Sequence, residues 1–167
     1  MVNLPLYDIA LWFYPVYSIP MSVIQHKRAY FDFEILETFE AGISLLGTEV
    51  KSIRIGQGKL DGAYVIIRGK EAFLVNASIP AFQKKNTATN YDPERPRKLL
   101  LTKKELTELE QKSEKQGLTI VPIKLYNKGS KLKLEIGIAR GKKKHDKRQH
   151  IKERDTMRDV AREIRHK

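Results

Sequence analysis

Two sets of side chains in this chain have the residue types that catalysis needs. Glu37 and Glu40 form a pair of carboxylates on an otherwise basic protein, and His145 stands directly before Asp146. A general base needs its orienting partner in space, and adjacent side chains in an exposed run rarely provide that geometry. A carboxylate on the binding face of a basic protein more often accepts donors from the ligand or orients a neighbouring Arg or Lys. Neither set therefore predicts an enzyme.

Other motifs that carry chemistry are missing from the sequence. It has no glycine-rich phosphate loop followed by Lys and Ser or Thr, so nothing supports nucleotide hydrolysis. Zero cysteine excludes a disulfide scaffold, a cysteine-ligated zinc site, an iron–sulfur cluster and a thiol nucleophile, and it fits a reducing cytoplasm. The histidines lack metal-ligand spacing with acids; they are His26, His145, His150 and His166. We expect no enzyme activity, no cofactor, no metal and no small-molecule substrate.

Positive charge is the strongest functional signal. The 167 residues include 32 Lys and Arg against 20 Asp and Glu, a net charge of +12, and the pI is about 9.8. Nucleic acid is therefore the leading partner class, with an anionic membrane second. The charge is −1 over residues 1–20, +6 over 21–139 and +7 over 140–167. We expect an apolar extension at 1–20, a basic domain at 21–140 and a strongly basic tail at 141–167.

The first twenty residues are apolar but match neither a signal peptide nor a membrane span. They contain no basic residue and no small-residue cleavage site, which a secretory signal needs. Three prolines and Asp8 interrupt the run of about 20 apolar residues that a transmembrane helix requires. The composition changes abruptly after Met21. Two interpretations stay open: a poorly ordered extension, or a natural translation start at Met21.

The body reads as a small β-rich domain. Strand-like patterns cover residues 31–39, 43–46, 63–68, 71–79, 119–126 and 131–139. Ala41 and Gly42 interrupt the first two patterns, Gly69 and Lys70 form a hairpin turn, and Pro122 indicates an edge strand or a bulge. About six short strands with long connections are compatible with a five- or six-stranded β-barrel of the oligonucleotide-binding type, with helices packed on it.

Two helices and a long loop are expected beside these strands. Thr102 and Glu105 form a capping box before a helix that should end by Gly117. A short helix over 48–56, capped by Thr48, competes with a strand there. Residues 80–97 contain three prolines and are expected to form a loop of a length that is usually functional or disordered.

The tail combines a basic run with a helical pattern. Residues 142–148 have too much charge to bury themselves, so they must be solvated or bound to a polyanion. Apolar residues then recur at helical spacing: Met157, Val160, Ala161 and Ile164. A single helix of about 15 residues is marginal in water, so we expect the tail to be disordered alone and helical when bound. The alternative is a basic tail that only raises nonspecific affinity.

Four segments together resemble the SsrA-binding protein family, also called small protein B, of bacterial trans-translation. They are Phe39–Gly42, Leu46–Arg54, Asp92–Leu101, and Gly141–Arg148 followed by Ile151–Arg154. The resemblance covers about residues 24–167 in the family's order and spacing. It implies a mainly β protein, an oligonucleotide-binding-type barrel with about three helices. It also implies binding to the tRNA-like domain of transfer-messenger RNA, which the protein delivers to stalled 70S ribosomes with elongation factor Tu.

The resemblance further implies that the protein, expected to be a cytoplasmic monomer, mimics an anticodon arm and places its tail in the empty messenger channel. The residues whose family counterparts contact RNA are Glu40, Lys51, Ser52, Arg54, Lys98, Leu100 and Thr102. Those matched to the decoding centre and the messenger channel are Lys142, Lys143, Lys144, His145, Asp146, Lys147, Arg148, Ile151 and Lys152.

Some positions depart from the family's pattern. His26 stands where the family usually has Asn, and Phe31 where it usually has His. Thr102 replaces a frequent Asn; it could cap the following helix and keep only part of an RNA contact. Residues 1–20 have no counterpart, which supports the Met21 start. Two rival classes remain: a general basic RNA-binding barrel without a rescue role, and a membrane-associated protein that uses residues 1–20 and the tail.

Overall fold

The computed structural model describes residues 24–83, 90–114 and 117–143, together with Thr156 and Arg162. Its strands are β1 (Ile24–Gln25), β2 (Phe33–Ile43), β3 (Tyr64–Arg68), β4 (Glu71–Val75), β5 (Arg97–Leu100), β6 (Leu118–Lys128) and β7 (Lys131–Gly141). Its helices are α1 (Ala29–Asp32), α2 (Gly47–Arg54) and α3 (Lys103–Ser113). The expectations for residues 1–20 and for Met21 lie outside the described residues.

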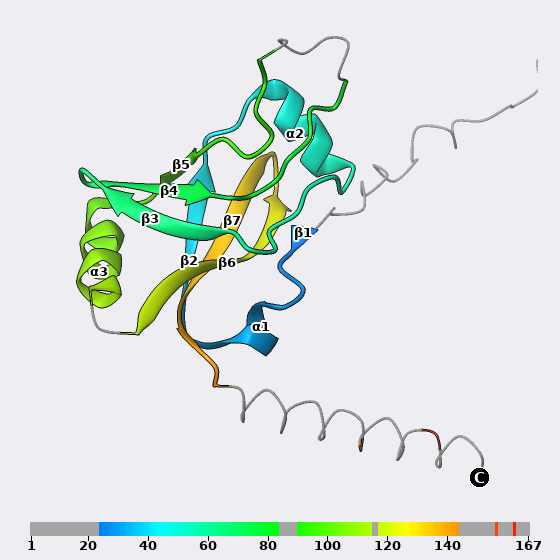
Figure 1. Cartoon of the computed structure of the whole chain (residues 1–167). Coiled ribbons are helices and arrows are strands. Elements are labelled where there is room, and N and C mark those ends of the chain that lie inside the picture. Colours follow the sequence, from blue (N-terminus) through cyan, green and yellow to red (C-terminus); the bar gives the residue numbers. More distant parts are fainter. Residues whose placement is uncertain (1–23, 84–89, 115–116, 144–155, 157–161, 163–167) are drawn as a thin grey trace, which may run out of the picture.

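The strands close into a barrel. The sheet order is β1-β6-β3-β4-β5-β2-β7, and β6 also pairs with β7, so six strands form a closed antiparallel ring. β1 and β3 both pair with β6, at Leu125 and Ile120 respectively. Figure 1 shows α3 at one end of the barrel, α2 near the opposite end, and α1 beside the end of β7. The expected oligonucleotide-binding type of barrel is confirmed, in its six-stranded form.

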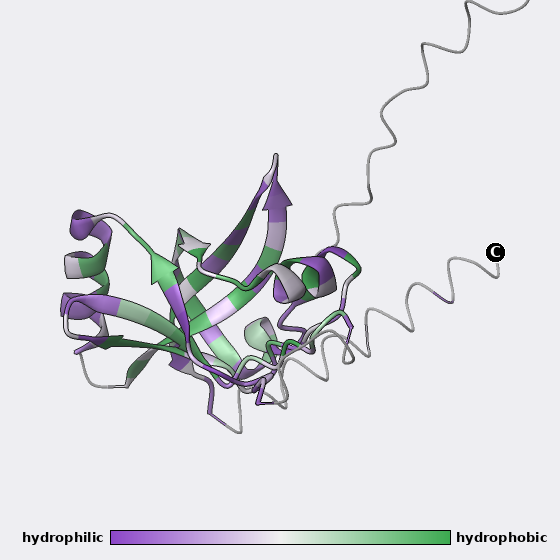
Figure 2. Ribbon diagram, turned by 90° about the horizontal axis from the view of Figure 1, so that it is seen from above, coloured by the Kyte–Doolittle hydropathy of each residue, from purple (hydrophilic) through white to green (hydrophobic). Residues whose placement is uncertain are grey.

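The core fills the inside of this ring. In β7 the predicted alternation is confirmed, because Leu134, Ile136 and Ile138 are buried while Lys131 is exposed. Bands of hydrophobic and hydrophilic residues alternate along the long strands in Figure 2, as expected for strands with one inner and one outer face. A Cβ atom on Gly137 would lie 2.9 Å from Ile123 Cδ1 and 3.0 Å from Ile35 Cγ2, so β7 is packed tightly at that point. No helix in the described parts of the chain is long and apolar enough to cross a bilayer.

The first strand differs from the prediction. α1 takes residues 29–32, so β2 begins at Phe33, and it then runs through Gly42 to Ile43 without the expected interruption. The irregularity lies instead between Ile35 and Glu37, where the register with β7 shifts. Residues 44–46 lead into α2 and form no strand. The pattern was misleading because Gly42 marks a close approach of β5, not a bulge: its Cβ would lie 3.1 Å from Leu100 Cβ.

β5 was not predicted. Arg97 and Leu99 point inward, and Lys98 and Leu100 point outward. An arginine at an inward position hides the usual alternation of apolar and polar residues, so the sequence offered only a loop up to residue 97. The strand predicted at 71–79 ends early, at Val75, because Asn76 adopts a positive φ of 58°.

The helices confirm most local signals. The Thr102 hydroxyl accepts from the Glu105 amide at 3.3 Å, and the Glu105 carboxylate accepts from the Thr102 amide at 2.8 Å, which is the predicted capping box. α2 forms as expected, but it begins one residue before Thr48, and Leu46 is its N-cap. The physical reason is Glu49, whose carboxylate accepts from the Leu46 amide at 2.7 Å.

The predicted turns and bulge are also present. Gly69 and Lys70 have φ values of 59° and 62°, so the tight β3–β4 hairpin is confirmed. The register of β6 shifts between Pro122 and Lys124, which confirms the bulge that Pro122 indicated. β6 is not an edge strand, because it pairs on both sides.

Candidate nucleic-acid interface

A buried ionic network joins α2 to the segment before β5. The Glu49 carboxylate lies 2.6 Å from the Arg95 guanidinium and 2.9 Å from that of Arg97. Glu49 and Arg97 are fully buried. Burial alone raises the pKa of Glu49, but hydrogen bonds from Arg95 and the Leu46 amide, with the charge of Arg97, lower it below its usual value. The carboxylate is therefore ionised at neutral pH and fully engaged.

Arg97 extends this network into the backbone. Its guanidinium donates to the carbonyls of Ala77 at 2.6 Å and Pro93 at 2.7 Å. The Tyr91 hydroxyl closes the far side, donating to the Ile79 carbonyl at 2.6 Å. These contacts hold α2, the loop around residues 91–96 and the start of β5 as one unit. Two of the segments that resemble the family, Leu46–Arg54 and Asp92–Leu101, meet here.

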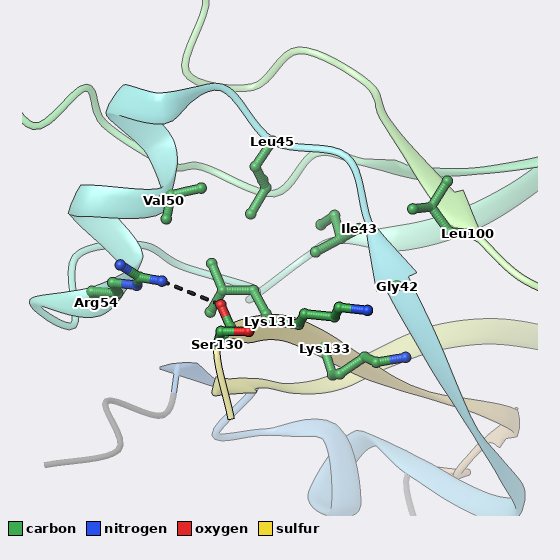
Figure 3. Close-up of a pocket in the computed structure, with 10 residues that line it drawn as sticks. Gly42, Ile43, Leu45, Val50, Arg54, Leu100, Ser130, Lys131 and Lys133 are labelled. Atoms are coloured by element: carbon green, nitrogen blue, oxygen red, sulfur yellow. Dashed lines mark hydrogen bonds between the residues drawn. The ribbon is translucent and has the colours of Figure 1, made fainter. Parts of the chain in front are cut away.

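A groove lies between α2, the ends of β2 and β5, and the start of β7. Its volume is about 380 Å³, and it is lined by Gly42, Ile43, Leu45, Val50, Arg54, Leu100, Ser130, Lys131, Leu132 and Lys133. Five of these residues are aliphatic and three are cationic. Figure 3 shows Lys131 and Lys133 extending in the same direction from β7, while Arg54 reaches across from α2. The Arg54 guanidinium donates to the Ser130 carbonyl at 3.3 Å, which bridges α2 to the β6–β7 turn. We call this cavity the α2–β7 groove.

Strand register places three of the groove residues and Tyr126 in one row. Gly42 pairs with Leu100 of β5 on one side and with Lys133 of β7 on the other, and Lys133 pairs with Tyr126 of β6. Leu100 is 57% exposed although it is a large aliphatic residue. Because Gly42 has no side chain, the Leu100 side chain packs over it: a Cβ atom on Gly42 would lie 3.1 Å from Leu100 Cβ and 3.4 Å from Leu100 Cδ1.

Glu40 organises the cations beside this row. Its carboxylate accepts a hydrogen bond from the Tyr126 hydroxyl and lies 2.9 Å from Lys128 Nζ and 3.6 Å from Lys133 Nζ. The bond from Tyr126, then that from Lys128, lowers the pKa of Glu40 to about 2. The same bond raises the pKa of Tyr126 to about 12. Such a carboxylate was expected either to accept donors from the ligand or to orient a neighbouring Arg or Lys. The geometry of Glu40 matches the second role.

The structure brings some of the predicted RNA-binding residues together and separates others. Arg54 and Leu100 line the α2–β7 groove. Lys51 is exposed on α2, with its ammonium 6.0 Å from the centre of the Phe82 ring. Lys98 is exposed on β5 and forms an ion pair with Glu71.

Ser52 and Thr102 use their hydroxyl groups inside the protein. Ser52 is buried, and its hydroxyl donates to the Pro80 carbonyl at 2.5 Å, so it anchors α2 and does not reach the surface in this conformation. Thr102 is exposed and caps α3, as its replacement of the family's usual Asn suggested. Both residues are thus placed where they position helices.

Sequence reasoning missed several residues of this face. Lys131 and Lys133 were seen only as outward-facing positions of a strand, and Tyr126 and Lys128 carried no functional signal at all. Their proximity to Glu40 arises from pairing between strands 86 or more residues apart in the chain. The alternation in β7 did identify which lysines face outward, and that was the one usable signal.

The basic tail begins at the other end of β2 and β7. Phe33 pairs with Gly141, whereas Gly42 pairs with Lys133, so nine residues of β2 separate the tail root from the groove. At about 3.3 Å per residue this is roughly 30 Å. Lys142 and Lys143 are described, and the other predicted tail residues lie outside the described residues: Lys144, His145, Asp146, Lys147, Arg148, Ile151 and Lys152. Within the described part, no group of three or more metal-ligating side chains comes together.

Comparisons with known proteins agree on one family. The family model described as SmpB protein matches residues 23–166. The chain is 48% identical to the SsrA-binding protein of Microcystis aeruginosa, over 86% of this chain and 93% of that protein. It is 50% identical to the SsrA-binding protein of Mesoplasma florum, over 84% and 95% respectively. It is also similar to a solved chain described as "tmRNA-SmpB: a journey to the center of the bacterial ribosome", with a TM-score of 0.62 and 47% identity over 74% of this chain and 86% of that one.

Proposed function

Because the chain belongs to the SmpB family, we propose that it binds transfer-messenger RNA and works in trans-translation, the rescue of stalled ribosomes. In this role it is an RNA-binding protein and not an enzyme. The observation that carries the proposal is the α2–β7 groove, which combines an aliphatic lining with Arg54, Lys131 and Lys133. The family relationship supplies the identity of the RNA, and the groove supplies the surface that holds it.

The chemistry of this surface suits a folded RNA. Double-helical RNA has a major groove too deep and narrow for side chains to read, so proteins hold it through phosphates, 2′-hydroxyls and unstacked bases. Lysines at the groove, with Lys98 and Lys128 near it, supply charges for phosphates. The exposed Leu100 side chain, which packs over Gly42, offers an apolar surface to the flat face of a ribose or an unstacked base. We place the tRNA-like domain of transfer-messenger RNA here.

The residues of the proposed RNA site divide into contacts and supports. Lys51, Arg54, Lys98 and Leu100 face outward and contact the RNA. Glu40 acts by holding Lys128 and Lys133 in place. Ser52 and Thr102 act by fixing α2 and α3.

The tail has a second task in this proposal. Residues 142–148, with Ile151 and Lys152, reach the decoding centre and the empty messenger channel, and the barrel stands where an anticodon arm would be. The separation of roughly 30 Å between the groove and the tail root supports this, because RNA and ribosome can then be engaged at once. Elongation factor Tu joins through the charged RNA, and the protein acts as a monomer in the cytoplasm.

The test is a pull-down of the full chain from its native lysate, with the bound RNA sequenced. We expect one long RNA with tRNA-like ends to dominate. Bound RNA that mirrors the total cellular pool would instead identify a general basic RNA-binding protein. The salt dependence of binding then tests the surface: each of Arg54→Ala, Lys131→Ala and Lys133→Ala should reduce the slope of log K against log salt by about 0.7–0.9. Unchanged slopes would show that the RNA does not contact this groove.

A further inference from the structure

The first residue after the barrel is fastened to α1 by two hydrogen bonds. The Lys142 amide donates to the Asp32 carbonyl at 2.9 Å, and the Lys142 ammonium donates to the Tyr30 carbonyl at 2.8 Å. Both acceptors belong to the four-residue helix α1. The last carbonyls of a helix have no partner within it, and a lysine near the C-terminus is a favourable donor to them. Lys142 therefore satisfies groups that would otherwise need water.

α1 is itself held firmly against the barrel. Ala29 is completely buried, and its amide donates to the His26 carbonyl at 3.0 Å. Arg28 and Asp32 form an ion pair at 3.1 Å across the helix. Phe33 follows α1 directly and pairs with Gly141, which directly precedes Lys142. A side chain that bonds to α1 is thus tied to the barrel.

We propose that Lys142 is a positioning residue that sets the direction in which the basic tail leaves the barrel. This rests on the proposed function, in which that tail enters the ribosome. Of the residues proposed above for the decoding centre, Lys142 would then act through the bond from its ammonium to Tyr30, and not by contact with ribosomal RNA. Residues 143–167 would span about 37 Å as a helix at 1.5 Å per residue, so a turn of 20° at the root displaces the far end by roughly 13 Å. Fixing the root also reduces the conformational freedom that is lost on binding.

A distance measurement in solution tests this positioning without any assay of function. The chain has no cysteine, so two introduced cysteines carry spin labels at defined places. Suitable changes are Gln111→Cys, at an exposed position of α3, and Lys144→Cys, two residues after Lys142. We expect a narrow distance distribution for the otherwise wild-type chain. Lys142→Met keeps the side-chain length and the main-chain bond, and it should broaden the distribution. Lys142→Arg keeps a donor and should restore it.

Peptide tagging on stalled ribosomes is the second measurement, made with unlabelled protein. Lys142→Met should lower tagging about three- to tenfold, as expected for the loss of one solvent-exposed hydrogen bond, and leave transfer-messenger RNA affinity unchanged. Lys142→Arg should recover most of the loss. The matched control Lys70→Met removes the same charge from the exposed β3–β4 turn and should leave the distance distribution unchanged.

Two outcomes would overturn the proposal. One is a distribution that is already broad in the wild type or is unaffected by Lys142→Met. The other is a distribution that Lys142→Met broadens while tagging stays undiminished, which would show that the hydrogen bond of the Lys142 side chain is not needed for function. If even the wild-type chain fails to support tagging, the proposed function fails, while the distances still show whether Lys142 fixes the start of the tail.

Discussion

The ammonium of Lys128 on β6 lies 3.0 and 2.9 Å from the two carboxylate oxygens of Glu40 on β2, although β7 runs between their strands. The contact therefore spans the outer face of the barrel, where Lys133 of β7 also approaches the same carboxylate. An acidic side chain in the middle of a basic face spaces its lysines. It also balances part of their charge, which limits the attraction of any polyanion that lacks the matching shape.

Glu40→Gln should reduce the preference for transfer-messenger RNA over bulk tRNA by about five- to tenfold. The variant frees Lys128 and Lys133 from a fixed geometry and removes one negative charge, so nonspecific binding rises while specific contacts are lost. Competition binding with both RNAs measures the ratio. Glu108→Gln makes the same charge change on exposed α3 and serves as the control. An equal effect of the two variants would assign the change to net charge alone.

The same carboxylate should make stability depend on pH below 4.5. The folded pKa of Glu40 is about 2, lowered from 4.5 by the Tyr126 and Lys128 hydrogen bonds. Its contribution is therefore present above pH 4.5 and is lost as the pH falls toward 2. Urea unfolding at a series of pH values should show a steeper loss over this range for the wild type than for Glu40→Gln. Parallel curves would contradict the lowered pKa.

Ionisation of Tyr126 should lower the stability of the protein at high pH. Its folded pKa is raised to about 12, chiefly by its hydrogen bond to Glu40, so its stabilising effect is present below pH 10 and is lost as the pH rises through 12. Ultraviolet titration of tyrosine ionisation should show late-titrating groups, because burial also raises the pKa of Tyr91. In Glu40→Gln the late absorbance should fall by one tyrosine equivalent, with Tyr126 returning toward pH 10. An unchanged number of late groups in the variant would exclude Glu40 as the cause.

Arg97→Met should cost about 3–5 kcal/mol of the free energy of unfolding. The substitution leaves the buried Glu49 carboxylate without one of its two cationic partners, and uncompensated buried charge is expensive. Lys98→Met is the matched control, because it removes the same charge at the next residue from an exposed pair and should cost at most about 1 kcal/mol. Urea unfolding of both variants gives the comparison. Similar costs would mean that the network adds little to stability.

Leu100→Ala should weaken transfer-messenger RNA binding about tenfold or more and change the free energy of unfolding by less than about 0.5 kcal/mol. The side chain is exposed in the free protein, and burying a leucine against RNA is worth about 1.5–3 kcal/mol. Leu36→Ala removes a different exposed leucine, which lies on β2, and should leave binding unchanged. Equal binding by the Leu100 variant would exclude this residue from the interface.

Deleting residues 144–167 should abolish peptide tagging and leave the Kd for transfer-messenger RNA within about twofold. The truncation retains β7 and both hydrogen bonds of Lys142, so the barrel stays intact, and the groove lies roughly 30 Å away. Filter binding and a tagging assay on stalled ribosomes measure the two activities. Tagging by the truncated chain would refute the role of the tail.

Several features could be predicted from consecutive residues because their interactions are local. The capping box of Thr102 and Glu105, the Gly69–Lys70 turn and the alternation in β7 each depend on neighbours in the chain. Such signals arise from backbone hydrogen bonding and from the period of a helix or strand, which a short window contains. The family motifs added the identity of the RNA. They did so by similarity, and they did not say which motif residues face outward.

The sequence by itself determined the basic character of the protein, its β-rich class, α3 and the hairpins. Only the tertiary structure decided that β6 closes the ring, that Ser52 is buried, and that Glu49 meets Arg95 and Arg97. It also decided that Glu40 holds Lys128, and that Lys142 bonds to α1. These contacts join residues from 28 to 112 positions apart. Which distant groups meet is set by the pairing and register of whole strands, because the barrel must close and bury its apolar face at the same time.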